Sequence, residues 1–280
     1  MITYDKGLPS LPDDIICEIF SLLDVGALKS CSLTGKALSC SAKQFLHRKL
    51  HLIHRSGMPT KPRVPGRWNQ LEGLPTLGER GLLRHTRHLS IILPYVPLFA
   101  HDLDPYIQHL HTLTNLMSFK ARDLDTPSFI PKMEEYFGAF SGNLQSLKLK
   151  SPAGDHEQIL YFVCQFPNLR DLKITRFRPY LNPTHNGGHH FNIKTSPHLN
   201  GTLQYVGLES DPMGAHPFLS DLVTLPSGLK FRAIKLSGCT RDDLQLLVDA
   251  CASTLECVEF TAGGLGVLFL RRGELSIVNL

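Results

Sequence analysis

A short apolar motif recurs along the last two thirds of the chain and limits the folds that this chain can adopt. The motif has the form L-x-x-L-x-L, and its best copies are NLQSLKL at 143–149, NLRDLKI at 168–174 and TLECVEF at 254–260. Weaker copies bring the number to seven, with middle apolar residues 24 to 34 positions apart: Leu89, Phe119, Leu147, Leu172, Val206, Ile234 and Val258. Repeats of about this period form arrays in which each unit buries its apolar face against its neighbours.

Helical patterns separate several copies of the motif. They lie at 130–142, 155–166 and 241–253, and Thr240 and Asp243 form a predicted capping pair at the start of the last one. A strand, a turn and a helix in repetition predict a parallel sheet that curves, with helices on its outer side. The expected class is therefore α/β.

The first 53 residues follow a different pattern, which predicts three helices. Pro12 suits a first helical position, and Asp13 and Asp14 place negative charge at the positive end of the helix dipole. Apolar residues then recur at helical spacing: Ile15, Ile16, Ile19, Phe20, Leu22 and Leu23. Further helices are predicted over 27–38 and 41–53. A bundle this small does not bury all of its apolar groups, so a partner or a neighbouring domain is expected to cover some of them.

The segment LPDDIICEIFSLLDVGALKSCSLTGKAL at 11–38 resembles an F-box, and the resemblance extends over about 43 residues, from 8 to about 50. Two positions depart from the family pattern: Leu38 replaces a common tryptophan, and Thr34-Gly35-Lys36 replaces Val-Cys-Arg. The resemblance implies that this block binds a Skp-family adaptor and, through it, a cullin ubiquitin-ligase scaffold. By position, the implied adaptor contacts are Leu11, Pro12, Ile15, Ile19, Phe20, Leu23 and Leu28. The alternative is that these residues pack only within the bundle.

The last repeat, IKLSGCTRDDLQLLVDACASTLECVEF at 234–260, resembles the cysteine-containing leucine-rich repeat of F-box proteins. The resemblance implies that Cys239 at the turn, Cys251 near the helix end and the matching Cys164 are small buried packing groups. A cysteine nucleophile or a metal site requires clustered histidine, aspartate or thiolate partners, and the sequence places none nearby. The histidines of HNGGHH at 185–190 lie in a segment predicted to be a solvated loop.

Side chains that alternate with the inward leucines are expected on the open face of the sheet. This criterion selects a mainly basic set as candidate substrate contacts: Lys120, Arg122, Lys148, Lys150, Lys173, Tyr205 and Lys235. A basic face favours a protein substrate that is acidic or phosphorylated at its contact point. The alternative is that the lysines only keep an exposed sheet soluble.

Together these patterns predict a small three-helix F-box over 1–55, a Pro/Gly-rich linker over 56–84 and an irregular leucine-rich-repeat solenoid over 85–280. Residues 266–280 are expected to add one more strand as a cap, unless the chain is truncated relative to related proteins. The predicted function is substrate recognition in a Skp–cullin–F-box ubiquitin ligase, without catalytic residues, metal or cofactor. The alternative is a repeat scaffold that takes no part in ubiquitin ligation.

Charge and composition indicate whether nucleic acid or a membrane is an expected partner, and in which compartment the protein is expected. The net charge of +4 is too small to indicate nucleic-acid binding. The most apolar run, 89–100, is short and contains two prolines, so no membrane span or leader peptide is expected. Seven cysteines, an odd number, suit reduced thiols in the cytoplasm or the nucleus.

Overall fold

The computed structural model describes residues 11–53, 73–93, 108–130, 133–179, 197–207, 216–262 and 265–271. Its main feature is a nine-stranded sheet in the order β1-β2-β3-β4-β6-β8-β9-β10-β11. The strands of this sheet are β1 (Lys49–Ile53), β2 (His88–Ile92), β3 (Ser118–Arg122), β4 (Ser146–Lys150), β6 (Asp171–Thr175), β8 (Thr202–Val206), β9 (Ala233–Ser237), β10 (Cys257–Ala262) and β11 (Leu265–Arg271). Every neighbouring pair is parallel except β10 and β11, which are antiparallel.

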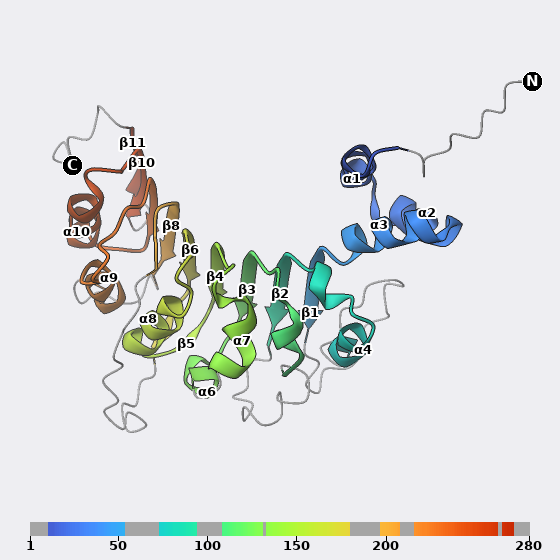
Figure 1. The fold of residues 1–280 in the computed structure, drawn as a ribbon. Helices are drawn as coiled ribbons and strands as arrows, with labels where there is room; N and C mark the ends of the chain where they lie inside the picture. Colours follow the sequence, from blue (N-terminus) through green and yellow to red (C-terminus); the bar gives the residue numbers. More distant parts are fainter. Residues whose placement is uncertain are drawn as a thin grey trace, which may run out of the picture.

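The helices fall into two groups along this row of strands (Figure 1). Three of them precede the sheet and lie beyond its β1 end: α1 (Asp13–Leu22), α2 (Val25–Thr34) and α3 (Lys36–Leu46). The others follow one side of the sheet: α4 (Leu74–Glu79), α6 (Thr126–Phe129), α7 (Met133–Ser141), α8 (His156–Cys164), α9 (Pro217–Val223) and α10 (Arg241–Cys251). Short 3-10 helices η3 (Leu83–His85) and η4 (Gln108–Thr112) and a small sheet of β5 (Ala153–Gly154) and β7 (Arg178–Pro179) complete the described elements. The predicted α/β class with a parallel sheet is confirmed.

The parallel register turns two positions of each strand into continuous buried rows. The first row is Leu50, Leu89, Phe119, Leu147, Leu172, Leu203, Ile234 and Val258, and the second is Leu52, Ile91, Ala121, Leu149, Ile174, Tyr205, Leu236 and Phe260. The helices cover these rows with aromatic side chains, among which Phe137 of α7 lies within 6.3 Å (ring centroids) of Phe119, Phe162 and Phe166. Burial of these apolar surfaces is the main stabilising contribution to the fold.

The structure corrects the predicted alignment of the β8 repeat. The sequence motif placed Val206 in the row of middle apolar residues, but the register places Leu203 there and pairs Val206 with Ser237. The reason is packing, because the shifted register turns Tyr205 into the core, where its ring stacks on Phe218 at 5.8 Å between centroids. Tyr205 is only 1% exposed, so the prediction that it lies on the open face is wrong.

The ends of the predicted helical block also differ from expectation. The helix predicted over 41–53 ends at Leu46, and the chain then forms β1, whose alternating Leu50 and Leu52 are buried in the sheet. The linker is predicted over 56–84, and most of it falls within residues 54–72, which lie outside the described residues. Its last part is not a linker, because Leu74, Leu77 and Leu83 are buried in the sheet core. In KLHLI every second residue is buried, as in a strand with one face on the core. Together with the three buried leucines, this strand shows that the sheet and its core begin before residue 85, where the sequence placed their start.

The helix predicted over 27–38 is interrupted at Gly35, where α2 ends and α3 begins, because Gly35 is extended and serves as the cap of both helices. The other predicted elements are present. Helices α7, α8 and α10 occupy the three predicted segments, and the capping box of Thr240 and Asp243 at the start of α10 is confirmed. At the other end, β11 adds the extra strand considered for the last residues, in antiparallel pairing with β10. The histidine segment at 185–190 lies outside the described residues.

A second connection between repeats comes from side chains at the start of five of the motifs. Asn115, Asn143 and Asn168 each donate a side-chain hydrogen bond to a backbone carbonyl of the preceding repeat, at 2.9, 2.8 and 2.6 Å. Thr86 and Thr254 make the equivalent bond through their hydroxyl groups, to the carbonyl oxygens of His47 and Phe231. This side-chain ladder satisfies carbonyl groups that the sheet leaves unpaired and fixes the spacing of the repeats.

The ladder predicts a measurable loss of stability when one donor is removed. Asn168→Asp keeps the side-chain shape but replaces the donor to the Gly142 carbonyl oxygen with an acceptor. We expect the free energy of unfolding, measured by urea denaturation, to fall by about 1–2 kcal/mol. The control is Asn200→Asp, an exposed asparagine that makes no such bond among the described residues, for which we expect a change below about 0.5 kcal/mol. Equal effects of the two substitutions would contradict a stabilising ladder.

Candidate functional site

Helix α1 has an apolar face on each of two sides. On one side, Ile16 and Phe20 are buried and pack with Leu28 and Ala42 into a small core, and the Phe20 ring meets Phe45 edge-on at 6.0 Å. On the other side, Ile15, Ile19 and Leu22 follow at the spacing i, i+4 and i+7 and form one stripe. Ile15 and Leu22 are exposed, and Leu22 is 82% exposed. Ile19, between them, is half-buried and packs against the small core, so the apolar stripe is exposed at its two ends.

The predicted adaptor contacts are divided between these two sides. Leu11, Pro12 and Ile15 are exposed, and Ile19 and Leu23 are half-buried. Phe20 and Leu28 are buried in the small core, so they support the helices from within and are not available as direct contacts. Sequence reasoning left Leu22 out of the contact set, although its spacing of seven residues from Ile15 places it on the same stripe. Val25 and Leu33 of α2 are also exposed.

Three of the predicted substrate contacts form a lysine row on the opposite face of the sheet from the core. Lys120 of β3, Lys148 of β4 and Lys173 of β6 are direct register partners on adjacent strands. Adjacent strands are about 4.8 Å apart, so the three side chains leave the sheet next to one another. Burial lowers the pKa of Lys173, and the neighbouring charges of Lys148, Lys120 and Lys235 lower it further. Like charges in register oppose sheet formation, so this row costs stability.

The remaining predicted contacts differ in how their charge is compensated. Arg122 lies 3.2 Å from the Asp123 carboxylate, and Lys235 lies 2.6 Å from the Glu259 carboxylate. The hydrogen bond to Glu259 raises the pKa of Lys235. Among the described residues, no ion pair includes Lys150 or a member of the lysine row. Among the predicted substrate contacts, the positive charge without an ion-pair partner in the described residues is therefore on β3, β4 and β6.

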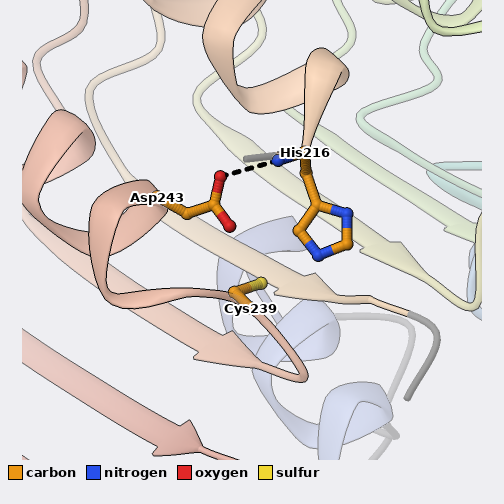
Figure 2. A group of neighbouring side chains, drawn as sticks. All are labelled: His216, Cys239 and Asp243. Atoms are coloured by element: carbon orange, nitrogen blue, oxygen red, sulfur yellow. Dashed lines mark hydrogen bonds between the residues drawn. The ribbon is translucent and has the colours of Figure 1, made fainter. Parts of the chain in front are cut away.

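A second cluster, which the sequence did not indicate, joins the β8–α9 and β9–α10 connections (Figure 2). It contains His216, Cys239 and Asp243, whose candidate ligand atoms lie within 4.8 Å of one another. His216 and Asp243 are 27 residues apart, so only the stacking of consecutive repeats brings them together. The spacing rules for metal or catalytic motifs within one segment do not find such a group.

The hydrogen bonds of this cluster give it a structural role. One Asp243 carboxylate oxygen accepts from the His216 backbone N–H at 2.8 Å, and the other accepts from the N–H and hydroxyl of Thr240 at 2.9 and 2.8 Å. The His216 Nε2 atom lies 3.1 Å from the Gly238 carbonyl oxygen, an acceptor, so Nε2 carries the proton and does not present a lone pair to a metal. Burial and the nearby Asp243 raise the pKa of the Cys239 thiol to about 12, which removes its nucleophilic form at neutral pH.

Comparisons with known proteins do not assign the chain to a family. No protein-family model matches it, and no curated protein matches it significantly. Within the described residues, no helix combines the length and the apolar character needed to cross a membrane.

The thiol environments predict a large difference in reactivity among the seven free cysteines. Cys17 and Cys40 are exposed, whereas burial raises the pKa of Cys164 and Cys239 to about 12. At pH 8 a thiol with that pKa has about one part in ten thousand in the thiolate form. We expect iodoacetamide to label Cys17 and Cys40 first and Cys164 and Cys239 last, as measured by peptide mass spectrometry over time. The same labelling in urea is the control and should make all sites react, whereas early labelling of Cys239 in the folded protein would contradict its structural role.

Proposed function

We propose that this protein is the substrate-recognition subunit of a Skp–cullin–F-box ubiquitin ligase. The observation that carries the proposal is the apolar stripe of Ile15, Ile19 and Leu22, of which Ile15 and Leu22 are exposed while Ile19 is half-buried against the core of the helical block. An apolar helix face that the protein leaves uncovered is suited to a hydrophobic groove on a partner. The F-box resemblance of residues 11–38 implies that this partner is a Skp-family adaptor.

The proposal includes a more specific description of the fold, as an F-box followed by a solenoid of leucine-rich repeats. Three short helices between Asp13 and Leu46 match the length and order of an F-box, which here is followed directly by β1. Five-residue parallel strands with helices along one side are consistent with a solenoid of leucine-rich repeats. Such a chain contributes binding surfaces and no catalytic group, since ubiquitin transfer belongs to other subunits of the complex.

The lysine row supplies the second half of the proposed function. Lys120, Lys148 and Lys173 provide adjacent ammonium groups for an acidic or phosphorylated segment of a protein substrate. The stability cost of placing them in register supports a role in binding over a role in solubility, because scattered lysines would give solubility without that cost. A protein that works in this way is expected in the cytoplasm or the nucleus.

One observation favours the alternative, a repeat scaffold without a part in ubiquitin ligation. Leu38 occupies the position of the common tryptophan, and its side chain packs against the small core of the helical block. This position of the family motif therefore packs towards the interior of the block, and the predicted adaptor contacts that remain accessible lie mainly on α1 and the residues before it. Adaptor binding distinguishes the two functions.

Adaptor binding should depend on the apolar stripe of α1. We expect the full chain to co-elute with a purified Skp-family adaptor in size-exclusion chromatography, and Ile15→Asp to weaken this binding by at least about a hundredfold. The reason is that a carboxylate cannot be desolvated in an apolar groove without a partner. Because Ile15 is exposed, the substitution should leave the fold intact, which circular dichroism checks.

The matched control is Leu33→Asp, which places the same charge at an apolar residue of α2 that is 86% exposed and lies outside the predicted contact set. It should leave adaptor binding unchanged. Binding of Ile15→Asp at wild-type strength would reject α1 as the docking face. Failure of the wild-type chain to bind any adaptor would reject the ligase function and favour the scaffold.

Removing the charges of the lysine row should raise the stability of the protein and weaken its binding to an acidic peptide. The triple variant Lys120→Gln, Lys148→Gln, Lys173→Gln removes like charges from adjacent strands, so we expect its free energy of unfolding to rise by about 0.5 kcal/mol or more. We expect the same variant to bind a fluorescent oligoglutamate peptide at least about tenfold more weakly at low salt, as measured by fluorescence anisotropy.

The control for the lysine row removes the same charge elsewhere. Lys36, Lys43 and Lys230 are exposed and lie outside the row, so their triple glutamine variant should bind the peptide nearly as well as the wild-type chain. Equal weakening in the two triple variants would mean that only net charge matters, and it would reject the row as a site.

A further inference from the structure

A hollow of about 760 Å³ lies between the helical block and the edge of the sheet where strands β1 to β4 begin. Helices α1 and α3 form one wall, with Glu18 and Gln44 among their contributions. The opposite wall comes from η3 and from the residues immediately before the strands, including Arg87 and Gln145. The volume is within the range of small-molecule sites and is much larger than one phosphate group.

The walls of this hollow carry an excess of positive charge. Arg48, Arg84 and Arg87 all line it, whereas Glu18 is the one acidic residue among the described lining. Among the described residues, none of these three arginines takes part in an ion pair. The Nε atom of Arg48 is buried and has no hydrogen-bond partner among the described residues. A ligand in the hollow can be contacted by the exposed side chains of Arg84 and Arg87 and by the part of Arg48 that lines it.

The sheet fixes the arginines close together. The backbone N–H groups of Arg87 and His88 both donate to the Arg48 carbonyl oxygen, at 2.9 and 3.0 Å, so Arg48 and Arg87 lie immediately before the adjacent strands β1 and β2. Arg84 lies three residues before Arg87, in η3, and its Nε atom donates to His85 Nε2 at 3.3 Å. The positive field acts on nearby groups, because Arg84 adds to the effect of burial in lowering the pKa of His85. The pKa of His88 is lowered in the same way by burial and by Arg48 and Arg87 among its neighbours.

We propose that this hollow binds a small anion that carries two or more phosphate groups. A guanidinium group donates two parallel hydrogen bonds to a phosphate, and three such groups around one hollow match several phosphates better than one. The polar wall, which includes Gln44 and Gln145, suits a charged ligand and not an apolar one. Because α1, α3 and the strand ends all line the hollow, a bound anion would also link the helical block to the sheet.

The test is isothermal titration calorimetry of the full chain with pyrophosphate, and with orthophosphate for comparison. We expect pyrophosphate to bind at least about tenfold more tightly than orthophosphate. The double variant Arg84→Gln, Arg87→Gln should weaken pyrophosphate binding at least about tenfold, since both side chains are exposed and their removal leaves the core unchanged. The matched control is Arg170→Gln, Arg232→Gln, which removes two exposed arginines immediately before β6 and β9, outside the hollow, and should change affinity less than about twofold.

A second arm distinguishes a soluble ligand from a lipid headgroup that carries the same chemistry. Phosphatidylcholine vesicles with 5% phosphatidylinositol 4,5-bisphosphate are floated with the wild-type chain and with both double variants. Flotation lost only in Arg84→Gln, Arg87→Gln identifies a lipid-borne phosphate, and pyrophosphate binding without flotation identifies a soluble anion. Absence of binding to either probe, or equal loss in the two double variants, would overturn the proposal.

Discussion

The in-register parallel pairing of short strands is the constraint on which the rest of this structure depends. From β1 to β10 each strand pairs with the next without a bulge, so a residue position in one strand becomes a row across the sheet. The inward positions form the two apolar rows of the core, and the position between them becomes the lysine row at Lys120, Lys148 and Lys173. A slip of one residue would exchange these faces and bury the lysines. Core and candidate site are therefore consequences of one register.

The sequence motif contains the physical means of holding that register. Its leucines fill the core rows, and its initial asparagine supplies the rungs of the side-chain ladder at Asn115, Asn143 and Asn168. Each of these bonds ties one repeat to a carbonyl group of the one before it, at the edge where the strands begin. This edge is also where Arg48 and Arg87 are placed next to each other, because both precede a strand by one residue. The repeated strands that stabilise the sheet therefore also bring the positive charges of these two arginines together at its edge.

Much of the fold could be predicted from the sequence because the spacing of apolar residues within each motif is visible in a short stretch of the chain. The capping box at Thr240 and the strands around Leu147 and Leu172 follow directly from residue types and spacing. The β8 alignment could not, because Leu203 and Val206 are both apolar and only the stacking of Tyr205 on Phe218 selects between them. The cluster of His216 and Asp243 was missed for a related reason, since repeat stacking brings together residues that are distant in sequence.

The lysine row and the arginine-lined hollow suit different kinds of ligand. The lysine row lies on an open face, where each ammonium group keeps most of its hydration, so attraction there is screened by salt and suits a long acidic segment. The arginines line a hollow of about 760 Å³, so a compact anion placed there can accept hydrogen bonds from several guanidinium groups at once. A ligand that binds only the folded chain also stabilises it, and a bound anion would do so by joining the helical block to the sheet. The difference in shape, and not in charge, therefore assigns the compact anion to the hollow and the extended acidic partner to the row.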